Sequence, residues 1–434
     1  MDQQPLGGDD RIAIVDGART PFAKAWTVYK HWNEADLARV ATRELVERAE
    51  LEPELIDEVV MGCVSAPMNG PNVAREVILR TPIPRMVPGY TVQEYCASSG
   101  LASLNAAGDI MMGGADVAIA GGVESMSAAQ ARVSLPLTHA LNDASSARSP
   151  IEMLEAFKDV GAQDLLPETP EIAEPTTGDR MGDSAEKMAK QFGISRRDQD
   201  EYTELTHHRT AEAYEEGRFP EVVPVLTGEE YDEPVEQDTL VRPDTSVDKM
   251  SGLSPVFDSE HGTVTAANSS PLTDGASAVL LMRESKAEEL GYEPKAYIRS
   301  YANVGVDLFD MPMLMGPTFA TPQALDRAGL TLDDMDLIEM HEAFAAQTLA
   351  NIRVWESDEK CRELGLDGAI GEVDMDIFNV NGGSIPIGHP FGATGGRMLI
   401  QLAGELERRD DQLGLLTMCA AGGLGLSIVL ERAE

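Results

Sequence analysis

Short apolar runs with the character of buried strands alternate along this chain with segments that have a helical apolar rhythm. In the first part, residues 10–16, 58–63, 90–95 and 116–121 are predicted strands, and residues 33–49 and 97–112 are predicted helices. Strands that alternate with helices favour an α/β fold with a largely parallel sheet. The 434 residues exceed what one compact core usually holds, so we expect two or three packed units.

The second half repeats this pattern without a close sequence repeat. Asp336–Met340 is a predicted strand that ends at His341 and leads into a helix, and we expect it to mirror the strand that ends at Cys96. Thr263–Met282 and Leu413–Leu430 are both predicted hairpins with a glycine-containing turn. The pattern therefore predicts two similar α/β halves, each sending a strand-to-helix junction into a shared site, since ligands favour the carboxyl ends of strands.

The stretch between the halves has a different composition. It is rich in Pro, Asp and Glu, carries a helical pattern at Asp183–Gly217, and is too long for an ordinary loop. We therefore expect an N-terminal half made of residues 1–132 and 253–285, an inserted subdomain at 133–252 that covers the site, and a C-terminal half at 286–434.

The charge balance is strongly acidic. Lys and Arg total 34 and Asp and Glu total 74, so the formal charge is 34 − 74 = −40, and only nine of the basic residues are Lys. Such a surface repels phosphate backbones and argues against nucleic-acid binding. Any anionic ligand would need basic groups concentrated around its site. Because the acidic residues are spread along the whole chain, they predict a folded, acid-coated surface rather than a disordered tail.

No targeting or membrane segment is expected. No run reaches 18 uninterrupted apolar residues, and the polar N-terminus, Met1–Asp10, lacks the basic and apolar regions of a signal peptide. The expected location is therefore the cytoplasm.

Four cysteines occur, with no CxxC spacing and no clustered His, so neither a zinc site nor, in a reducing compartment, a disulfide is expected. Cys63 and Cys361 are interpreted as buried small hydrophobic residues. Cys96 lies at a strand-to-helix turn followed by small residues, in the segment Glu94–Gly100. There the helix dipole and free N–H groups are expected to lower the thiol pKa, and nearby amides could hold an oxyanion. Alone, a packed cysteine is the commoner interpretation.

The segment Asn379–Gly396 (NVNGGSIPIGHPFGATGG) is the most distinctive in the chain. So much glycine, with two prolines, indicates a backbone held tightly around a ligand or catalytic group. His389 lies between Gly388 and Pro390, which restrains its backbone. A surface-loop histidine is the alternative, and the functional interpretation is the base that takes the proton of Cys96.

Two further segments carry candidate groups. Cys419 ends a predicted strand before the glycine-rich turn of Met418–Gly425 (MCAAGGLG), and His341 opens His341–Ala345 (HEAFA). Core packing for Cys419 and a backbone-satisfied helix terminus for His341 are the structural alternatives.

In this order and at these intervals, the four segments closely resemble the thiolase family. The resemblance covers essentially the whole chain and includes Ala18–Phe22 (ARTPF), Gly121–Met126 (GGVESM), Met181–Glu186 (MGDSAE) and Ala267–Ala276 (ANSSPLTDGA). It implies a thiolase-like α/β fold with a mixed five-stranded sheet in each half, packed in layers.

The resemblance also implies roles. Cys96 would be the acylated nucleophile, His389 its activating base, and Cys419 the proton shuttle for the second substrate. His341 would hold a water in one oxyanion hole, and the amides of Cys96 and Ala421 would form the other. Alanine at 421 departs from the glycine of many thiolases but keeps the N–H. Ser270, Met181 and Phe344 are implied as substrate-binding residues. No metal or redox cofactor is implied, because coenzyme A is itself a substrate.

The HEAFA form, in which His341 replaces the Asn of many thiolases, resembles the fatty-oxidation subgroup that pairs with a hydratase/dehydrogenase subunit. It implies a 3-ketoacyl-CoA thiolase of β-oxidation, with a homodimer or a dimer of dimers. A biosynthetic acetoacetyl-CoA thiolase is the alternative. A ketoacyl synthase, which uses two histidines with its cysteine, is disfavoured by Cys419, and a non-catalytic acyl-CoA or lipid carrier by the intact set of site residues.

Two expectations concern the surroundings of the protein. Residues 144–166, where a membrane element would lie, hold only Arg148 and Lys158 as basic residues, so attraction to anionic lipid is poor. The charge of −40 and the scarcity of lysine predict a protein from a high-salt cytoplasm that needs salt to stay folded.

Overall fold

The computed structural model describes residues 10–167, 173–228 and 230–433. Most of the polar N-terminus considered above, residues 1–9, lies outside these ranges. Within the described ranges, no helix is long and apolar enough to cross a membrane.

The central feature is one mixed sheet with the strand order β10-β11-β12-β9-β1-β8-β5-β3-β4, with β2 pairing on β8. In chain order the strands are β1 (Ile12–Arg19), β2 (Ala23–Lys24), β3 (Glu58–Gly62), β4 (Gly89–Val92), β5 (Val117–Ser125), β8 (Thr273–Arg283), β9 (Ala296–Gly305), β10 (Leu337–Met340), β11 (Leu413–Ala420) and β12 (Leu424–Arg432). The two halves of this sheet meet at a short antiparallel contact, where Ala13 pairs with Tyr297 and Ile14 pairs with Ala296. A separate two-stranded hairpin is formed by β6 (Val225–Thr227) and β7 (Glu233–Val235).

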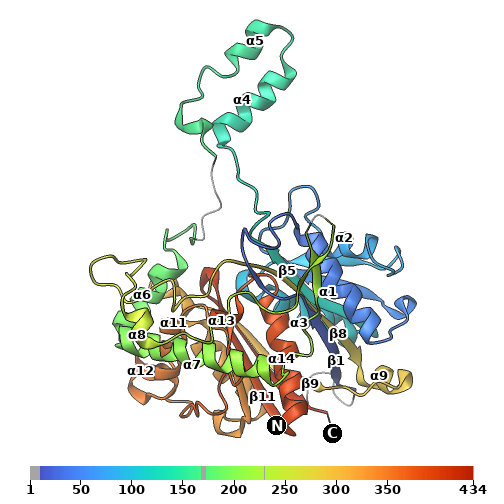
Figure 1. The fold of residues 1–434 in the computed structure, drawn as a ribbon, viewed down its shortest axis with the longest axis vertical. Helices are drawn as coiled ribbons and strands as arrows, with labels where there is room; N and C mark the ends of the chain where they lie inside the picture. Colours follow the sequence, from blue (N-terminus) through green and yellow to red (C-terminus); the bar gives the residue numbers. More distant parts are fainter. Residues whose placement is uncertain (1–9, 168–172, 229, 434) are drawn as a thin grey trace.

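Helices cover both faces of each half-sheet (Figure 1). The helices of the body of the molecule are α1 (Glu34–Arg48), α2 (Val73–Leu79), α3 (Ser98–Met111), α6 (Met181–Phe192), α7 (Arg196–Glu215), α8 (Val247–Ser251), α9 (Glu284–Leu290), α10 (Gly316–Ala328), α11 (Ala345–Trp355), α12 (Asp358–Glu363), α13 (Ser384–Ile387) and α14 (Thr394–Arg409).

Alternation along the strands separates the core into layers. Val59 and Met61 of β3 pack into a cluster with α1 and α2, whereas Val60 between them faces a cluster built on α3 and α14. Leu416 of β11 packs into the same cluster on α3 and α14, whereas Leu415 packs against α10 and α11 on the opposite face of the sheet. A period of two puts successive side chains on opposite faces, so the molecule is layered helix–sheet–helix–sheet–helix, with α3 and α14 in the middle.

The two halves share one topology. In the N-terminal half β3 lies between β4 and β5, all parallel, and β8 and β1 follow as antiparallel neighbours. In the C-terminal half β10 is parallel to β11, and β12 and β9 follow in the same way. The position equivalent to β4 is reduced to a single parallel bridge between Ile338 and Phe378, so four regular strands stand where five were predicted.

This correspondence corrects one sequence prediction. The strand before Cys96 is β4, at the edge of its half-sheet, whereas the strand before His341 is β10, the counterpart of β3. The true partner of the Cys96 junction is therefore the junction after Phe378, which leads through the glycine-rich segment and His389 into α14. His341 and His389 nevertheless lie close together, because β10 pairs with the chain at Phe378.

The first predicted hairpin is also wrong. Leu413–Leu430 does form a hairpin of β11 and β12, but of Thr263–Met282 only β8 is a strand, and it pairs with β5 and β1. The preceding residues instead make isolated bridges, Ser269 to Phe344 and Leu272 to His389. The residues before β8 therefore line the site, and they do not form a second strand.

Two glycines allow α3 and α14 to cross closely at the centre. A Cβ atom placed on Gly395 would lie 2.6 Å from the backbone nitrogen of Gly100. Backbone cannot move aside as a flexible side chain can, so position 395 requires glycine, whereas a Cβ atom on Gly100 would meet the Leu426 side chain at 2.5 Å. The crossing fixes the N-termini of both helices, and these termini lead directly to Cys96 and His389.

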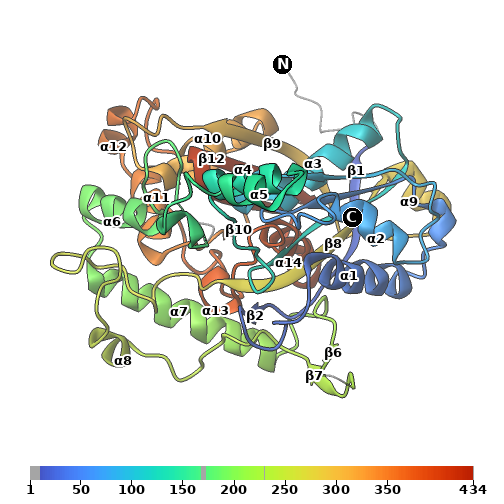
Figure 2. The same cartoon turned by 90° about the horizontal axis from the view of Figure 1, so that it is seen from above.

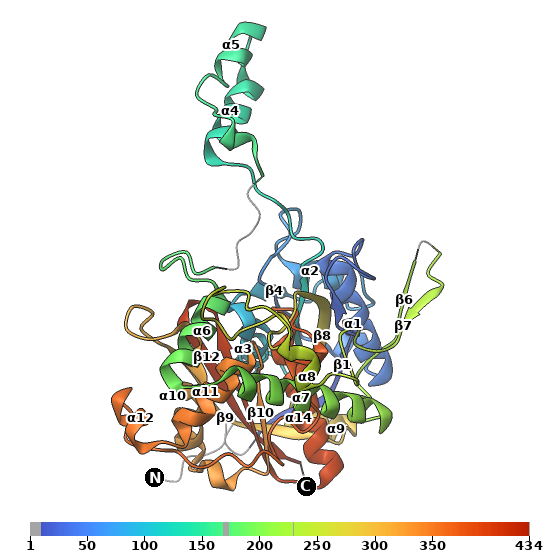
Figure 3. The same cartoon turned by 60° about the vertical axis from the view of Figure 1, so that its left-hand side comes forward.

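The region at 133–252 divides into parts with different positions. Helices α4 (Leu135–Ser146) and α5 (Pro150–Glu155) form a hairpin that stands away from the body of the molecule (Figures 1 and 3). Figure 2, which views the molecule from above, shows this hairpin over the body and α6 and α7 along one side of it. Its helices expose Leu135, Ile151 and Leu154.

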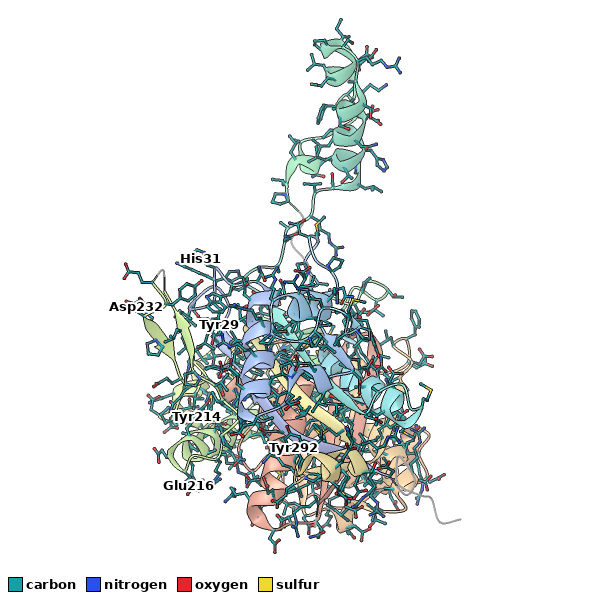
Figure 4. The ribbon with its side chains drawn as sticks, turned by 90° about the vertical axis from the view of Figure 1, so that its right-hand side faces the viewer. Tyr29, His31, Tyr214, Glu216, Asp232 and Tyr292 are labelled. Atoms are coloured by element: carbon teal, nitrogen blue, oxygen red, sulfur yellow. The ribbon has the colours of Figure 1, made fainter. Side chains whose placement is uncertain are left out.

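Helix α7 joins the two halves. Tyr202 and Thr206 donate hydrogen bonds to Glu342 of the C-terminal half at 2.7 and 2.8 Å. At its other end Tyr214, labelled in Figure 4, donates to Asp238 at 2.7 Å, and Asp238 pairs with Arg19 of β1.

Candidate active site

A pocket of about 680 Å³ opens where the two strand-to-helix junctions meet. Its lining residues come from both halves and from the 133–252 region, and they include Cys96, Met181, Ser270, Phe344, His389, Cys419 and Ala421. His341 lies directly behind His389, with ring centroids 4.1 Å apart. The structure therefore brings together every residue that the sequence singled out for this site.

Cys96 is held on a strained turn. Tyr95, just before it, has φ +48°, a left-handed conformation that costs a residue with a side chain of the order of 1–3 kcal/mol. The Ser98 hydroxyl clamps this turn, accepting from the Glu94 N–H at 2.8 Å and donating to the Tyr95 carbonyl at 2.6 Å. Cys96 is half-buried and lies in the short 3-10 turn Tyr95–Ala97 between β4 and α3, where it lines the pocket.

The thiol differs from the sequence expectation in its protonation. Burial raises the pKa of Cys96 to about 12, although hydrogen bonds from the Ala421 and Cys96 amides act in the opposite direction. The expected lowering by the helix terminus is therefore outweighed by desolvation. Cys96 is therefore a neutral thiol at rest, and it would need a base in order to act as a nucleophile.

His389 has the tautomer of such a base. Its Nδ1 lies 2.6 Å from the Thr394 hydroxyl, and that hydroxyl donates its only proton to the Pro390 carbonyl at 3.0 Å. The hydroxyl must therefore accept from Nδ1–H, which leaves Nε2 as a free lone pair. That Nε2 is buried and has no hydrogen-bond partner within the described part of the chain. Burial lowers the pKa of His389 to about 3, so the ring is neutral.

The backbone around His389 is equally fixed. Its N–H donates to the Thr273 hydroxyl at 3.0 Å. Gly388 before it has φ +105°, which a residue with a side chain rarely adopts, and Glu124 accepts from the N–H of Gly392 after it at 3.1 Å. The same Glu124 carboxylate accepts from Val64 and Ser65 at 3.1 and 2.8 Å, so it links the loop after β3 to the glycine-rich segment.

His341 is fully buried, and its Nε2 also has no partner among the described residues. Burial, reinforced by the positive charge of Arg397, lowers its pKa well below the usual value, so it too is neutral. Its Nδ1 lies 2.8 Å from the Ser384 hydroxyl.

One ring nitrogen from each histidine and the Cys96 sulfur all lie within 4.8 Å of one another. These ligand types also bind zinc in other proteins. However, a nucleophile and its base need the same proximity, and the hydrogen-bonded Nδ1 atoms fit that use. The absence of a metal requirement stays a prediction.

Cys419 and Ala421 approach the site from the other half. Cys419 ends β11 with no exposed surface, and burial together with the neighbouring Cys96 raises its pKa well above the usual range. Ala421 begins the turn between β11 and β12, and its N–H reaches the Cys96 sulfur. The two amides that the resemblance implied for an oxyanion hole are thus both beside the nucleophile.

The implied substrate-binding residues line the outer part of the pocket. Phe344 packs edge-on against Phe257 with centroids 6.0 Å apart, and Met181 opens α6. Ser270 is fixed by its N–H, which donates to the Ala343 carbonyl at 2.9 Å. Leu272, Leu314 and Phe391 complete an apolar wall near Cys96.

Only a few basic side chains lie on or near the pocket. Arg180 lies on the pocket, and a second pocket of about 360 Å³, which shares Ser269 with the first, is lined by Arg242, Lys249 and Asp244. Lys249 pairs with Asp244 at 2.6 Å. Arg180, Arg242 and Lys249 lie near the site, but Asp244 offsets the charge of Lys249.

Sequence reasoning assigned no role to Thr394, Ser384, Arg397 or Glu124. Three of them lie inside quoted motifs, Thr394 and Ser384 within the glycine-rich segment and Glu124 within GGVESM. A polar residue inside an otherwise apolar and glycine-rich motif was the available signal.

Comparison with known proteins gives a consistent result. Residues 12–285 match the thiolase N-terminal domain and residues 292–432 the thiolase C-terminal domain. The chain is 49% identical over 423 residues to a 3-ketoacyl-CoA thiolase of Yersinia pestis (strain Pestoides F) and 48% identical to one of Yersinia enterocolitica, covering 97% of each chain.

Two solved structures are similar over the full length of both chains, at 30% identity and a TM-score of 0.84. They are the acetyl-CoA acetyltransferase of Bacillus anthracis and human mitochondrial 3-ketoacyl-CoA thiolase in complex with CoA. With both domains matched, and with Cys96, His389 and Cys419 on one pocket, the chain belongs to the thiolase family of acyltransferases.

Proposed function

We propose that this protein is a 3-ketoacyl-CoA thiolase that transfers an acyl group to CoA through an acyl-Cys96 intermediate and releases acetyl-CoA. The observation that carries this proposal is the convergence of the Cys96 thiol, an unprotonated His389 Nε2 and a second thiol, Cys419, on one pocket. No metal or redox cofactor takes part, and CoA is a substrate.

In the first half-reaction, His389 Nε2 takes the Cys96 proton as the sulfur attacks the 3-keto carbon. The amides of Cys96 and Ala421 stabilise the oxyanion that forms. The bond between C2 and C3 then breaks, the electron pair passes to C2, and Cys419 protonates the departing acetyl-CoA. The acyl group remains on Cys96. His341 binds the thioester oxygen of the enolate, through a water as the family resemblance implies.

In the second half-reaction, the Cys419 thiolate takes the proton of the incoming CoA thiol. The CoA sulfur attacks the acyl carbonyl on Cys96, and the tetrahedral intermediate collapses to acyl-CoA. The Cys96 sulfur recovers its proton from His389. A separate base is needed because Cys96 is esterified when CoA reacts.

The degradative direction is favoured by the relatives. The two compared relatives at 48–49% identity are both named 3-ketoacyl-CoA thiolases. The biosynthetic alternative is supported only by the Bacillus anthracis structure, at 30% identity, and the human 3-ketoacyl-CoA thiolase is equally similar. We therefore propose a role in fatty acid β-oxidation.

Further parts of the proposal concern the surroundings. The N-terminal half is formed by residues 1–132 and 253–285, the C-terminal half by 286–434, and the region 133–252 contributes pocket residues from α6. The enzyme works in a salty cytoplasm as a homodimer or dimer of dimers, with a hydratase/dehydrogenase chain as partner. The net charge of −40 supports the salty cytoplasm, and the HEAFA motif supports the hydratase/dehydrogenase partner.

Thiolysis with purified protein tests the function. Short-chain and long-chain 3-ketoacyl-CoA are each incubated with CoA, and both products are followed by chromatography. For each substrate, the proposal expects one acetyl-CoA for every shortened acyl-CoA that forms. A protein that acts on acetoacetyl-CoA alone would favour the biosynthetic alternative, and one that acts on neither would contradict thiolase activity.

A further inference from the structure

Ser384 lies between a site histidine and a buried cation. It is the first residue of α13 and has no exposed surface. Its hydroxyl oxygen is 2.8 Å from Nδ1 of His341 on one side and 3.0 Å from Nη2 of Arg397 on the other. Arg397, on α14, is also fully buried.

Arg397 is held in place by its other partners. Its Nη1 donates to Glu339 at 2.5 Å and to Gln401 at 2.9 Å. A guanidinium has only N–H donors and keeps its charge in proteins, so the contact with Ser384 has one possible polarity: Arg397 donates and Ser384 accepts.

The proton of Ser384 then has one acceptor within reach. Among the described residues the hydroxyl makes no third hydrogen bond, so its O–H is satisfied only if it donates to Nδ1 of His341. If Nδ1 carried the proton instead, the Ser384 O–H would be a buried unsatisfied donor, at a cost of about 1–3 kcal/mol. A doubly protonated ring is opposed by burial and by the Arg397 cation.

We propose that Ser384, oriented by Arg397, is a positioning residue that holds His341 as its Nε2–H tautomer. The two site histidines therefore differ although their rings are only 4.1 Å apart. His389 presents a lone pair because Thr394 has the Pro390 carbonyl for its own proton, and His341 presents an N–H because Ser384 has no such carbonyl.

This difference assigns the two rings to different tasks. A lone pair can take the Cys96 proton, whereas an N–H can bind the oxygen of a substrate carbonyl or a water that bridges to it. Two lone pairs side by side would leave the oxygen without this donor. The tautomer of His341 is inferred from the hydrogen bonds of Ser384 alone. The use of its N–H to bind a substrate oxygen rests on the proposed function.

The first test is the tautomer itself. The chain has only seven histidines, so uniform ¹⁵N-histidine labelling gives a small set of ring signals. His341→Asn identifies the signals of His341 by their loss. We expect Nε2 of His341 to show the shift of a protonated nitrogen and Nδ1 that of an unprotonated one. A proton on Nδ1 in the native enzyme would overturn the proposal without any further variant.

The second test is Ser384→Ala with a matched control. Ser277→Ala removes another buried hydroxyl, which donates to the Ala393 carbonyl at 2.8 Å in the same glycine-rich segment but contacts neither histidine. We expect Ser384→Ala to lose the pure Nε2–H signature and to lower kcat about 10–100-fold, less than the 10²–10³ that complete removal of an oxyanion donor costs, because His341 itself remains. Ser277→Ala should keep both the signature and most of the turnover.

The outcomes separate the two proposals. An unchanged His341 tautomer in folded Ser384→Ala contradicts the role of Ser384. Should that variant fail to fold, the wild-type spectrum alone still decides the tautomer. A protein that shows the Nε2–H tautomer but no thiolysis contradicts the proposed function and leaves the positioning role intact.

Discussion

Cys96 and His389 face each other at rest as a neutral thiol and a neutral imidazole. Burial raises the pKa of the thiol to about 12 and lowers that of the imidazole to about 3, because both charged forms lose water. No thiolate–imidazolium pair is therefore present at rest. Proton transfer occurs with attack, when the oxyanion amides and the substrate replace the lost solvation.

The neutral pair predicts the pH dependence of alkylation. Because the folded pKa of the thiol is raised, the thiolate fraction increases tenfold for each pH unit up to about 12. The rate of inactivation by iodoacetamide should therefore keep rising from pH 6 to 9 without levelling. A plateau in this range that His389→Ala abolishes would instead indicate a preformed ion pair.

Cys419 has its own prediction at this scale. In Cys419→Ser the hydroxyl is a weaker acid than the thiol it replaces, so turnover should fall by about 10²–10⁴-fold. Acylation of Cys96 should persist in part, since His389 and the amides remain. Steady-state thiolysis and mass analysis of the acyl-enzyme are measured on the same preparation, and unchanged turnover would refute the shuttle role.

The convergence of the candidate residues was predictable from sequence, but their protonation was not. Cys96, His341, His389 and Cys419 are marked by motifs; three of them line the pocket, and His341 packs behind His389. The tautomers depend on Thr394, whose proton goes to the Pro390 carbonyl, and on Ser384, which accepts from Arg397 and has no such carbonyl. The pKa of the Cys96 thiol depends on how far the side chain is buried, and a sequence motif does not give that burial.

At the scale of elements, the crossing of α3 and α14 aligns the two junctions. Gly395→Ala would bring a methyl group to 2.6 Å from the Gly100 nitrogen, so the helices must separate. We expect a loss of about 1–3 kcal/mol in the free energy of unfolding, as for other overpacked cores. Activity should fall with it, because the displaced termini carry Cys96 and His389.

Gly404→Ala is the matched control for this prediction. It lies in the same helix with nothing within 4 Å of the added methyl group, so it should be neutral or stabilise by about 0.5–1 kcal/mol. Both variants are compared by thermal and denaturant unfolding. Equal stabilities would contradict the close crossing.

The elements themselves were predicted better than their pairing. Strong apolar runs located β3, β5 and β10 within one or a few residues. The run at 263–282 was divided wrongly because the sequence does not state that β8 pairs with β5 and β1, both distant along the chain. The topological equivalence of the Cys96 and His389 junctions likewise follows from strand order, which local patterns leave open.

At the scale of the whole molecule, charge is the dominant feature. A net charge of −40 far exceeds the magnitude of roughly 2–8 that keeps a small domain soluble. Some carboxylates are paired at the surface, as in Arg197–Glu201, but acidic residues outnumber basic ones by 74 − 34 = 40. Their mutual repulsion opposes the compact state at low ionic strength.

Salt should therefore stabilise the protein and increase its activity. The Debye length falls from about 30 Å at 0.01 M salt to about 3 Å at 1 M, so repulsion among carboxylates and between the surface and CoA is screened. We expect the unfolding midpoint and the thiolysis rate both to rise from dilute buffer to molar KCl. A midpoint and rate that stay flat or fall would identify an acidic protein with no requirement for salt.

The acyl-enzyme gives the most direct test of the central claim, that acyl transfer passes through Cys96. The protein is incubated with acetyl-CoA, quenched in acid, digested and mapped by mass spectrometry, with Cys96→Ala as the control. The account predicts one acetyl group per chain on the peptide that contains Cys96, and none in the variant. An acetyl group found mainly on Cys419, or full thiolysis by Cys96→Ala, would contradict it.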